Sequence, residues 1–166
     1  MTQFLFATIV FFALSTQAKV TVAFLQLRDS QGQVVQLETG GRFYHVAISY
    51  KGKWLQAHPY RGVEMVTIDK IRQVGEITEW IEISDLEDLE DKKVEKFLGR
   101  PFDHSFLWDD EKIYCAELVG KLLDLKPTPM TFDPAHWPKE YQKFNGLPGM
   151  SPDDIYEALR QQKLSQ

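Results

Sequence analysis

The sequence contains a single cysteine, Cys115, which excludes an internal disulfide bond. No cysteine lies near the N-terminus, where a lipid could be attached. An exported protein usually avoids an unpaired thiol, because its compartment is oxidising. If the chain is exported, Cys115 therefore invites a chemical explanation.

Positive charge is also scarce, since 19 Lys and Arg residues face 24 Asp and Glu residues and the formal net charge is -5. A phosphate backbone would repel such a chain, and no stripe of basic residues interleaved with aromatic residues overrides this locally. We expect no nucleic-acid partner. The composition, 43% hydrophobic and 26% charged, is that of a globular protein with one ordinary domain.

Several motifs are absent as well. The sequence has no His-Glu-x-x-His motif and no paired cysteines, so no metal site is expected. It has no Gly-rich phosphate loop and no Gly-x-Ser-x-Gly elbow, which argues against nucleotide binding and serine hydrolysis. We therefore expect no cofactor.

Long hydrophobic runs are missing except at the N-terminus, where residues 4–14 are apolar and are followed by Ser-Thr-Gln and Ala18. This layout is typical of a secretory signal peptide. An uncleaved anchor is the alternative, but a bilayer span needs roughly 20 apolar residues. We predict a signal peptide over residues 1–18, cleavage after Ala18, a periplasmic or secreted protein, and no stable membrane span in the mature chain of residues 19–166.

The first half of the mature chain favours antiparallel strands. Residues 20–27 and 34–37 are β-prone and flank the turn sequence Asp-Ser-Gln-Gly, which predicts a hairpin. A second hairpin is predicted from residues 43–50 and 54–58, and residues 63–68 form a further strand. The prediction is an antiparallel meander.

The second half favours helices. Ser84 and Glu87 form a capping-box pattern, and apolar residues recur at helical spacing up to Gly99 and Pro101. A second apolar periodic stretch follows residues 109–111 and ends near Pro127, which puts Cys115 in the first turn of a helix. Residues 126–150, rich in proline and aromatic residues, predict an irregular segment, and a final helix begins at residues 151–154.

Cys115 is the candidate nucleophile. A thiolate attacks carbonyl carbon, and the positive end of a helix dipole together with free backbone N–H groups stabilises the anion. The same N–H groups can hold a developing oxyanion. The alternative is a buried structural cysteine, which position alone would favour.

His45 is the most interesting of the four histidines, because an imidazole near the start of an apolar strand needs a polar partner. It is the candidate base, and a structural histidine bonded to a backbone carbonyl is an equal alternative. His58 and His136 lie in loop-like contexts where surface packing is the default.

Two segments carry a resemblance. Residues 98–119 contain Gly-Arg-Pro-Phe-Asp, an aromatic and acidic stretch, and Tyr-Cys-Ala-Glu-Leu-Val. Residues 44–48 read Tyr-His-Val-Ala-Ile, and residues 52–57 continue this pattern. Together these segments resemble the permuted branch of the NlpC-type papain-like cysteine hydrolases, the YiiX-like proteins. Residues 19–40 match that family poorly.

The resemblance implies an α+β, papain-like fold that is circularly permuted, with an antiparallel sheet packed against helices and the nucleophile at a helix N-terminus. It implies Cys115 as nucleophile, His45 as base and Gln56 as the residue that orients the imidazole, where the family usually has glutamate. His58 is the rival orienting residue. Tyr114, Trp54 and His58 are candidate substrate contacts.

The expected activity is that of an exported thiol hydrolase that cleaves amide or peptide bonds. Export and the resemblance together suggest bacterial cell-wall peptides as substrates, which is an argument by analogy. A lipid acyl hydrolase or acyltransferase of the same fold is the first alternative, favoured by an apolar groove that Trp54, Trp108 and Phe106 could line. A non-catalytic binding module is the second alternative, and the glutamine at position 56 is the feature that supports it.

Overall fold

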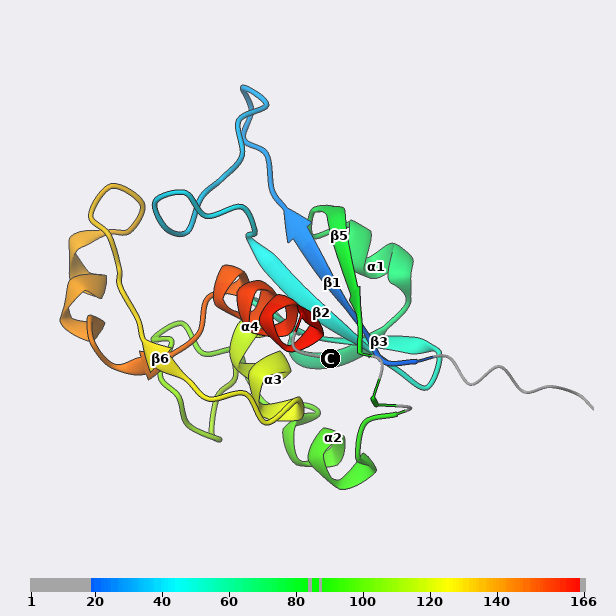
Figure 1. The fold of residues 1–166 in the computed structure, drawn as a ribbon. Coiled ribbons are helices and arrows are strands. Elements are labelled where there is room, and N and C mark those ends of the chain that lie inside the picture. Colours follow the sequence, from blue (N-terminus) through cyan, green and yellow to red (C-terminus); the bar gives the residue numbers. More distant parts are fainter. Residues whose placement is uncertain (1–18, 84, 87, 165–166) are drawn as a thin grey trace, which may run out of the picture.

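The computed structural model describes residues 19–164 except Ser84 and Glu87 (Figure 1). The predicted signal peptide and the predicted capping box of Ser84 and Glu87 therefore lie outside the described residues. In the described part no helix is both long enough and apolar enough to cross a bilayer.

A five-stranded antiparallel sheet forms the centre of the fold, in the order β4-β3-β2-β1-β5. Strands β1 to β4 form the predicted meander, and β5 adds to the free side of β1. The short helix α1 (Ile68–Arg72) connects β4 to β5. The strands are β1 (Thr21–Gln26), β2 (His45–Tyr50), β3 (Lys53–His58), β4 (Gly62–Val66) and β5 (Glu76–Glu82).

The β2–β3 hairpin turns through Lys51 and Gly52, which have φ values of 46° and 73°. Two consecutive positive φ values match the right-handed twist of the flanking strands, and glycine accepts such a value without steric cost. The turn fixes the register that pairs Ile48 with Leu55. This hairpin is where the sequence predicted it.

The predicted first hairpin is wrong in its second strand. Residues 34–37 form no strand; a single bridge joins Val34 to Arg28. The turn at Asp29 does form, since its side chain accepts hydrogen bonds from the backbone N–H groups of Gln31 and Gln33. Because β2 and β5 occupy both edges of β1, residues 34–37 can pair only beyond its end.

Three helices cover one face of the sheet, and α1 lies on the opposite face (Figure 1). They are α2 (Asp91–Phe97), α3 (Cys115–Leu122) and α4 (Pro152–Leu164). Helix α2 is shorter than predicted, since it begins at Asp91. Leu86 and Leu89, which were expected to lie within it, precede the helix but still pack in the core. The final helix begins as predicted, with the Ser151 hydroxyl accepting from the Asp154 backbone N–H at 3.0 Å.

The main core lies between α3 and the sheet. Val46 and Ile48 of β2 and Leu118 and Val119 of α3 are almost completely buried there. A smaller cluster on the other face joins Ala23, Leu25, Ala47 and Ile71. Burial of this order stabilises a domain by roughly 25 cal/mol per Å² of apolar surface, so α3 is held firmly against β2.

The segment between α3 and α4 is mostly irregular, as the sequence predicts. It contains the two short strands β6 (Thr128–Pro129) and β7 (Pro148–Gly149), which pair with each other, and a 3₁₀ helix over Lys139–Phe144. Figure 1 shows this segment extending away from the sheet beyond β6.

Candidate active site

Cys115 is the first residue of α3, so the predicted position at a helix N-terminus is confirmed. Tyr114 precedes it with an extended backbone and donates its N–H to the Glu117 carboxylate at 3.3 Å. The Tyr114 hydroxyl accepts a hydrogen bond from the Met150 backbone N–H at 3.0 Å. These contacts fix the backbone on which the Cys115 thiol is carried.

His45 is the first residue of β2 and is 3% exposed. Its Nε2 lies 2.9 Å from Oε1 of Gln56, a completely buried residue of β3. The ladder between β2 and β3 pairs residues from Ile48 and Leu55 toward the turn. At the other end of the two strands, the hydrogen bond between the side chains of His45 and Gln56 joins β2 to β3.

The main influence on His45 is burial, which lowers the pKa of its imidazole from 6.5 to about 4. The hydrogen bond to Gln56 acts in the opposite direction, and the nearby His58 lowers the pKa further. His45 is therefore a neutral ring at neutral pH, with one nitrogen protonated and the other free to accept a proton.

Burial also dominates at Cys115, where it raises the thiol pKa from 9.0 to about 11. The backbone N–H groups of Val46, Ala116 and Cys115 itself lower this pKa, but by less than burial raises it. The sequence predicts a helix N-terminus that stabilises the thiolate, and that contribution is present. Its net effect was overestimated, because Cys115 is only 8% exposed.

Cys115, His45 and Tyr114 line one cavity of about 560 Å³. The Val46 N–H acts on the Cys115 sulfur, so the thiol lies beside the start of β2, where His45 is also found. Tyr44 faces the same cavity, and burial and the nearby Cys115 raise its pKa. The structure thus brings the nucleophile and base candidates to a single cavity.

Aromatic side chains supply much of the cavity wall. Phe106 is their centre, with ring centroids of five other aromatic residues between 5.1 and 6.2 Å away. Its φ of 54° is unusual for a bulky residue, and the Asp103 carboxylate holds the loop by accepting from the backbone N–H groups of Ser105 and Leu107. The aromatic wall includes Tyr44, Phe102, Phe106, Phe132, Trp137 and Tyr141.

Two segments far apart in sequence meet at the cavity. Residues 27–41 and 128–151 are joined by hydrogen bonds from Trp137 Nε1 to the Leu37 carbonyl at 2.5 Å and from Thr39 to Asp133 at 2.8 Å. The Ser151 hydroxyl also donates to Glu38 at 2.6 Å. We call these two segments the cover.

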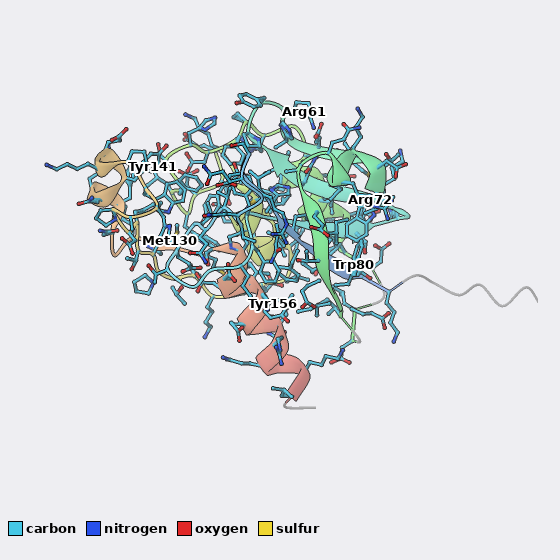
Figure 2. All side chains as sticks on the ribbon, turned by 90° about the horizontal axis from the view of Figure 1, so that it is seen from above. Arg61, Arg72, Trp80, Met130, Tyr141 and Tyr156 are labelled. Carbon is cyan, nitrogen blue, oxygen red and sulfur yellow. The ribbon has the colours of Figure 1, made fainter. Side chains whose placement is uncertain are left out.

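The structure does not place Trp54 and His58 in the cavity wall. The Trp54 ring lies 5.3 Å from the Trp80 ring and packs with the small cluster on the far face of the sheet. Figure 2 places Met130 and Tyr141, two wall residues, at the end of the molecule away from Trp80. His58 accepts a hydrogen bond from the Tyr60 N–H through Nδ1, whereas Gln56 contacts His45.

Glu64, which accepts a hydrogen bond from Gln56 Nε2 at 2.9 Å, was not predicted from the sequence. Register was the available signal: in β3 and β4, Gln56 lies directly opposite Glu64. The wall that residues 129–141 contribute was also not predicted, because only the path of the irregular segment brings that wall to the same cavity as Cys115.

Comparison with known proteins identifies a solved structure with a similar fold. No protein-family model matches the chain, and a search of curated proteins gives no match. The crystal structure of the metalloprotein yiiX from Escherichia coli O157:H7 is similar, with a TM-score of 0.57 and 19% sequence identity. The likeness covers 84% of this chain and 91% of that one. This chain is therefore a mixed α+β protein with a YiiX-like fold.

Proposed function

We propose that the protein is a thiol hydrolase of the permuted NlpC-type, papain-like kind that cleaves amide or related acyl bonds through Cys115 and His45. One observation carries this proposal: a free thiol at a helix N-terminus and a buried neutral imidazole line the same cavity, and Gln56 holds the imidazole. A nucleophile, a base and an orienting group are the three parts that covalent acyl transfer needs.

The mechanism depends on which ring nitrogen of His45 carries the proton. Gln56 Oε1 accepts the His45 Nε2–H, so the lone pair of the neutral ring is on Nδ1. Nδ1 takes the Cys115 proton while the sulfur bonds to the carbonyl carbon, and the backbone N–H of Cys115 donates to the oxyanion. Nδ1–H then returns the proton to the leaving amine or alcohol as the acyl bond breaks. Water releases the acyl group by the same two proton transfers.

The two pKa values decide when the proton moves. A thiol with a pKa of about 11 and an imidazole with a pKa of about 4 rest as a neutral pair at pH 7. Proton transfer therefore accompanies the attack of sulfur on carbon, as in general base catalysis, and no stable thiolate–imidazolium pair precedes it.

The substrate class follows from the wall of the cavity and from the resemblance. Export and the YiiX-like motifs support cell-wall peptides, and export itself remains a proposal because residues 1–18 lie outside the described part. The aromatic wall around Phe106 favours the alternative, a lipid acyl substrate, because an apolar chain gains most from such a surface.

A metal is not part of this proposal, although yiiX is described as a metalloprotein. Among residues 19–164 other than 84 and 87, no three His, Cys, Asp or Glu side chains are grouped so that they could hold a metal ion. His45 Nε2 is already bound to Gln56, which leaves its other nitrogen and Cys115 as potential ligands. These donors do not fit a metal centre, since structural sites use about four protein ligands and catalytic sites about three.

The test is acyl transfer to Cys115. The mature protein is incubated with p-nitrophenyl acyl esters of different chain length and with cell-wall peptides, and its intact mass and product release are followed. The proposal predicts an acyl adduct on Cys115 and turnover, both absent in Cys115→Ala and strongly reduced in His45→Ala. No adduct and no turnover with any probe would support the binding-module alternative.

A further inference from the structure

Gln56 has two chemically different ends of nearly equal size. Its Oε1 only accepts hydrogen bonds, and its Nε2 only donates them. The end that faces His45 decides which ring nitrogen carries the proton. A donor facing His45 Nε2 would leave the proton on Nδ1, which could then not accept the Cys115 proton.

Glu64 removes this ambiguity. It lies opposite Gln56 in the β3–β4 register, and its Oε1 is 2.9 Å from Gln56 Nε2. An ionised carboxylate only accepts hydrogen bonds, so it selects the NH₂ end of the amide. Gln56 is completely buried, which leaves Oε1 to face His45.

Arg61 keeps Glu64 ionised and in place. Its Nε lies 2.9 Å from Glu64 Oε2, and its Nη2 lies 2.8 Å from Oε1. This two-point contact is the main reason that the Glu64 pKa is lowered, and Gln56 lowers it further.

We propose that Glu64, held by Arg61, is a positioning residue that orients the Gln56 amide and thereby fixes His45 as the Nε2–H tautomer. The catalytic consequence, a free Nδ1 that can accept the Cys115 proton, depends on the function proposed above; the tautomer does not. The arrangement moves the carboxylate charge one residue away from the imidazole. His45 consequently has an orienting partner without direct contact with a full negative charge.

Histidine-labelled protein tests the proposal by ¹⁵N NMR, with His45→Ala assigning the His45 signals. The wild type is expected to show the Nε2–H tautomer. Glu64→Ala should give a mixture of tautomers and lower the rate of Cys115 acylation about 10- to 100-fold, the usual effect of losing an outer partner of a site residue. Glu82→Ala, which removes an exposed ion pair to Lys19 in the same sheet, should leave both unchanged.

A swapped pair separates positioning from packing. In Gln56→Glu with Glu64→Gln, the same groups exchange places, and the carboxylate at position 56 accepts directly from His45. The tautomer should remain Nε2–H and the His45 pKa should rise, whereas Gln56→Glu alone brings two carboxylates into contact and should perturb the site. Because the swap conserves side-chain size and charge, it also addresses the case in which Glu64→Ala fails to fold.

An unchanged His45 tautomer in folded Glu64→Ala would overturn the proposal, and so would an unchanged His45 pKa in the swapped pair. Failure of the thiol hydrolase proposal gives a different result, because the tautomer would then respond to Glu64 while no variant, nor the wild type, formed an acyl adduct.

Discussion

At the scale of single residues, His45 is unusual because its buried ring is hydrogen-bonded to a neutral amide, that of Gln56. We predict that the ring stays neutral down to about pH 5 and titrates near its lowered pKa of about 4. Histidine side-chain NMR over pH 3–8 measures this. Titration near the ordinary value of 6.5 would mean that water reaches the ring.

The same pKa makes a stability prediction. In the unfolded chain, His45 becomes protonated as the pH falls below 6.5. In the folded chain, it becomes protonated only near pH 4. Folding stability from this residue is therefore complete above pH 6.5 and falls as the pH drops toward 4, by on the order of 3 kcal/mol for a difference of this size. Urea unfolding of wild type and His45→Gln at pH 4 and 7 tests it, since the variant should lack this dependence.

Local motifs and strand position named Cys115 and His45 as candidates from the sequence, and both line the same cavity. Sequence reasoning named Gln56 by resemblance but missed Glu64, whose role depends on strand register. It also overestimated the effect of the helix N-terminus on the thiol, because the burial of Cys115 is a tertiary property. Residue types indicated the chemistry, but the surrounding protein determines the protonation states.

At the scale of elements, the start of β4 depends on Gly62. Its φ is +72°, and an added Cβ would lie 2.2 Å from the Arg100 carbonyl oxygen, to which Val63 N–H donates. Gly62→Ala should therefore cost about 1–3 kcal/mol or more of folding stability. Gly52→Ala, with φ +73° and open space around the Cβ, is the matched control and should cost about 1 kcal/mol. Equal losses in thermal or urea unfolding would contradict the steric argument.

Helix α3 carries a second titrating group, Glu117, whose side chain is completely buried. Burial raises its pKa from 4.5 to about 7, although Lys121 Nζ lies 2.8 Å from Oε1. The folded chain therefore holds this proton more tightly than the unfolded chain, and stability falls as the pH rises from 4.5 to 7. Glu117→Gln should gain stability relative to wild type across this window, and a constant difference in unfolding free energy would exclude this origin.

Sequence patterns predicted some strands and helices of this fold and missed others. The meander and helix α3 follow from strong local periodicity and turn chemistry. Residues 34–37 are β-prone but have no free edge of β1 to join. Strand β5 was not predicted, because only three of its seven residues, Ile77, Trp80 and Ile81, are apolar.

At the scale of the whole molecule, the cover links segments about 100 residues apart through Trp137 and Leu37. Trp137→Ala should open the cavity, hydrate the thiol and lower the Cys115 pKa from about 11 toward 9.0. Alkylation of Cys115 by iodoacetamide at pH 8 should then accelerate, by up to about 100-fold if the whole shift is lost. Trp80→Ala, on the other face of the sheet, should leave the rate unchanged. Equal rates in both variants would mean that the cover does not control access to the thiol.

The central claim, that His45 activates Cys115 for acyl transfer, is tested most directly by the single-turnover rate of Cys115 acylation at pH 7. Wild type and His45→Ala are mixed with a p-nitrophenyl acyl ester, and the adduct is quantified by intact mass. The account predicts rapid acylation of wild type and a loss of about 10²- to 10⁴-fold in the variant, the usual contribution of a positioned base. Equal rates in the two proteins would contradict it.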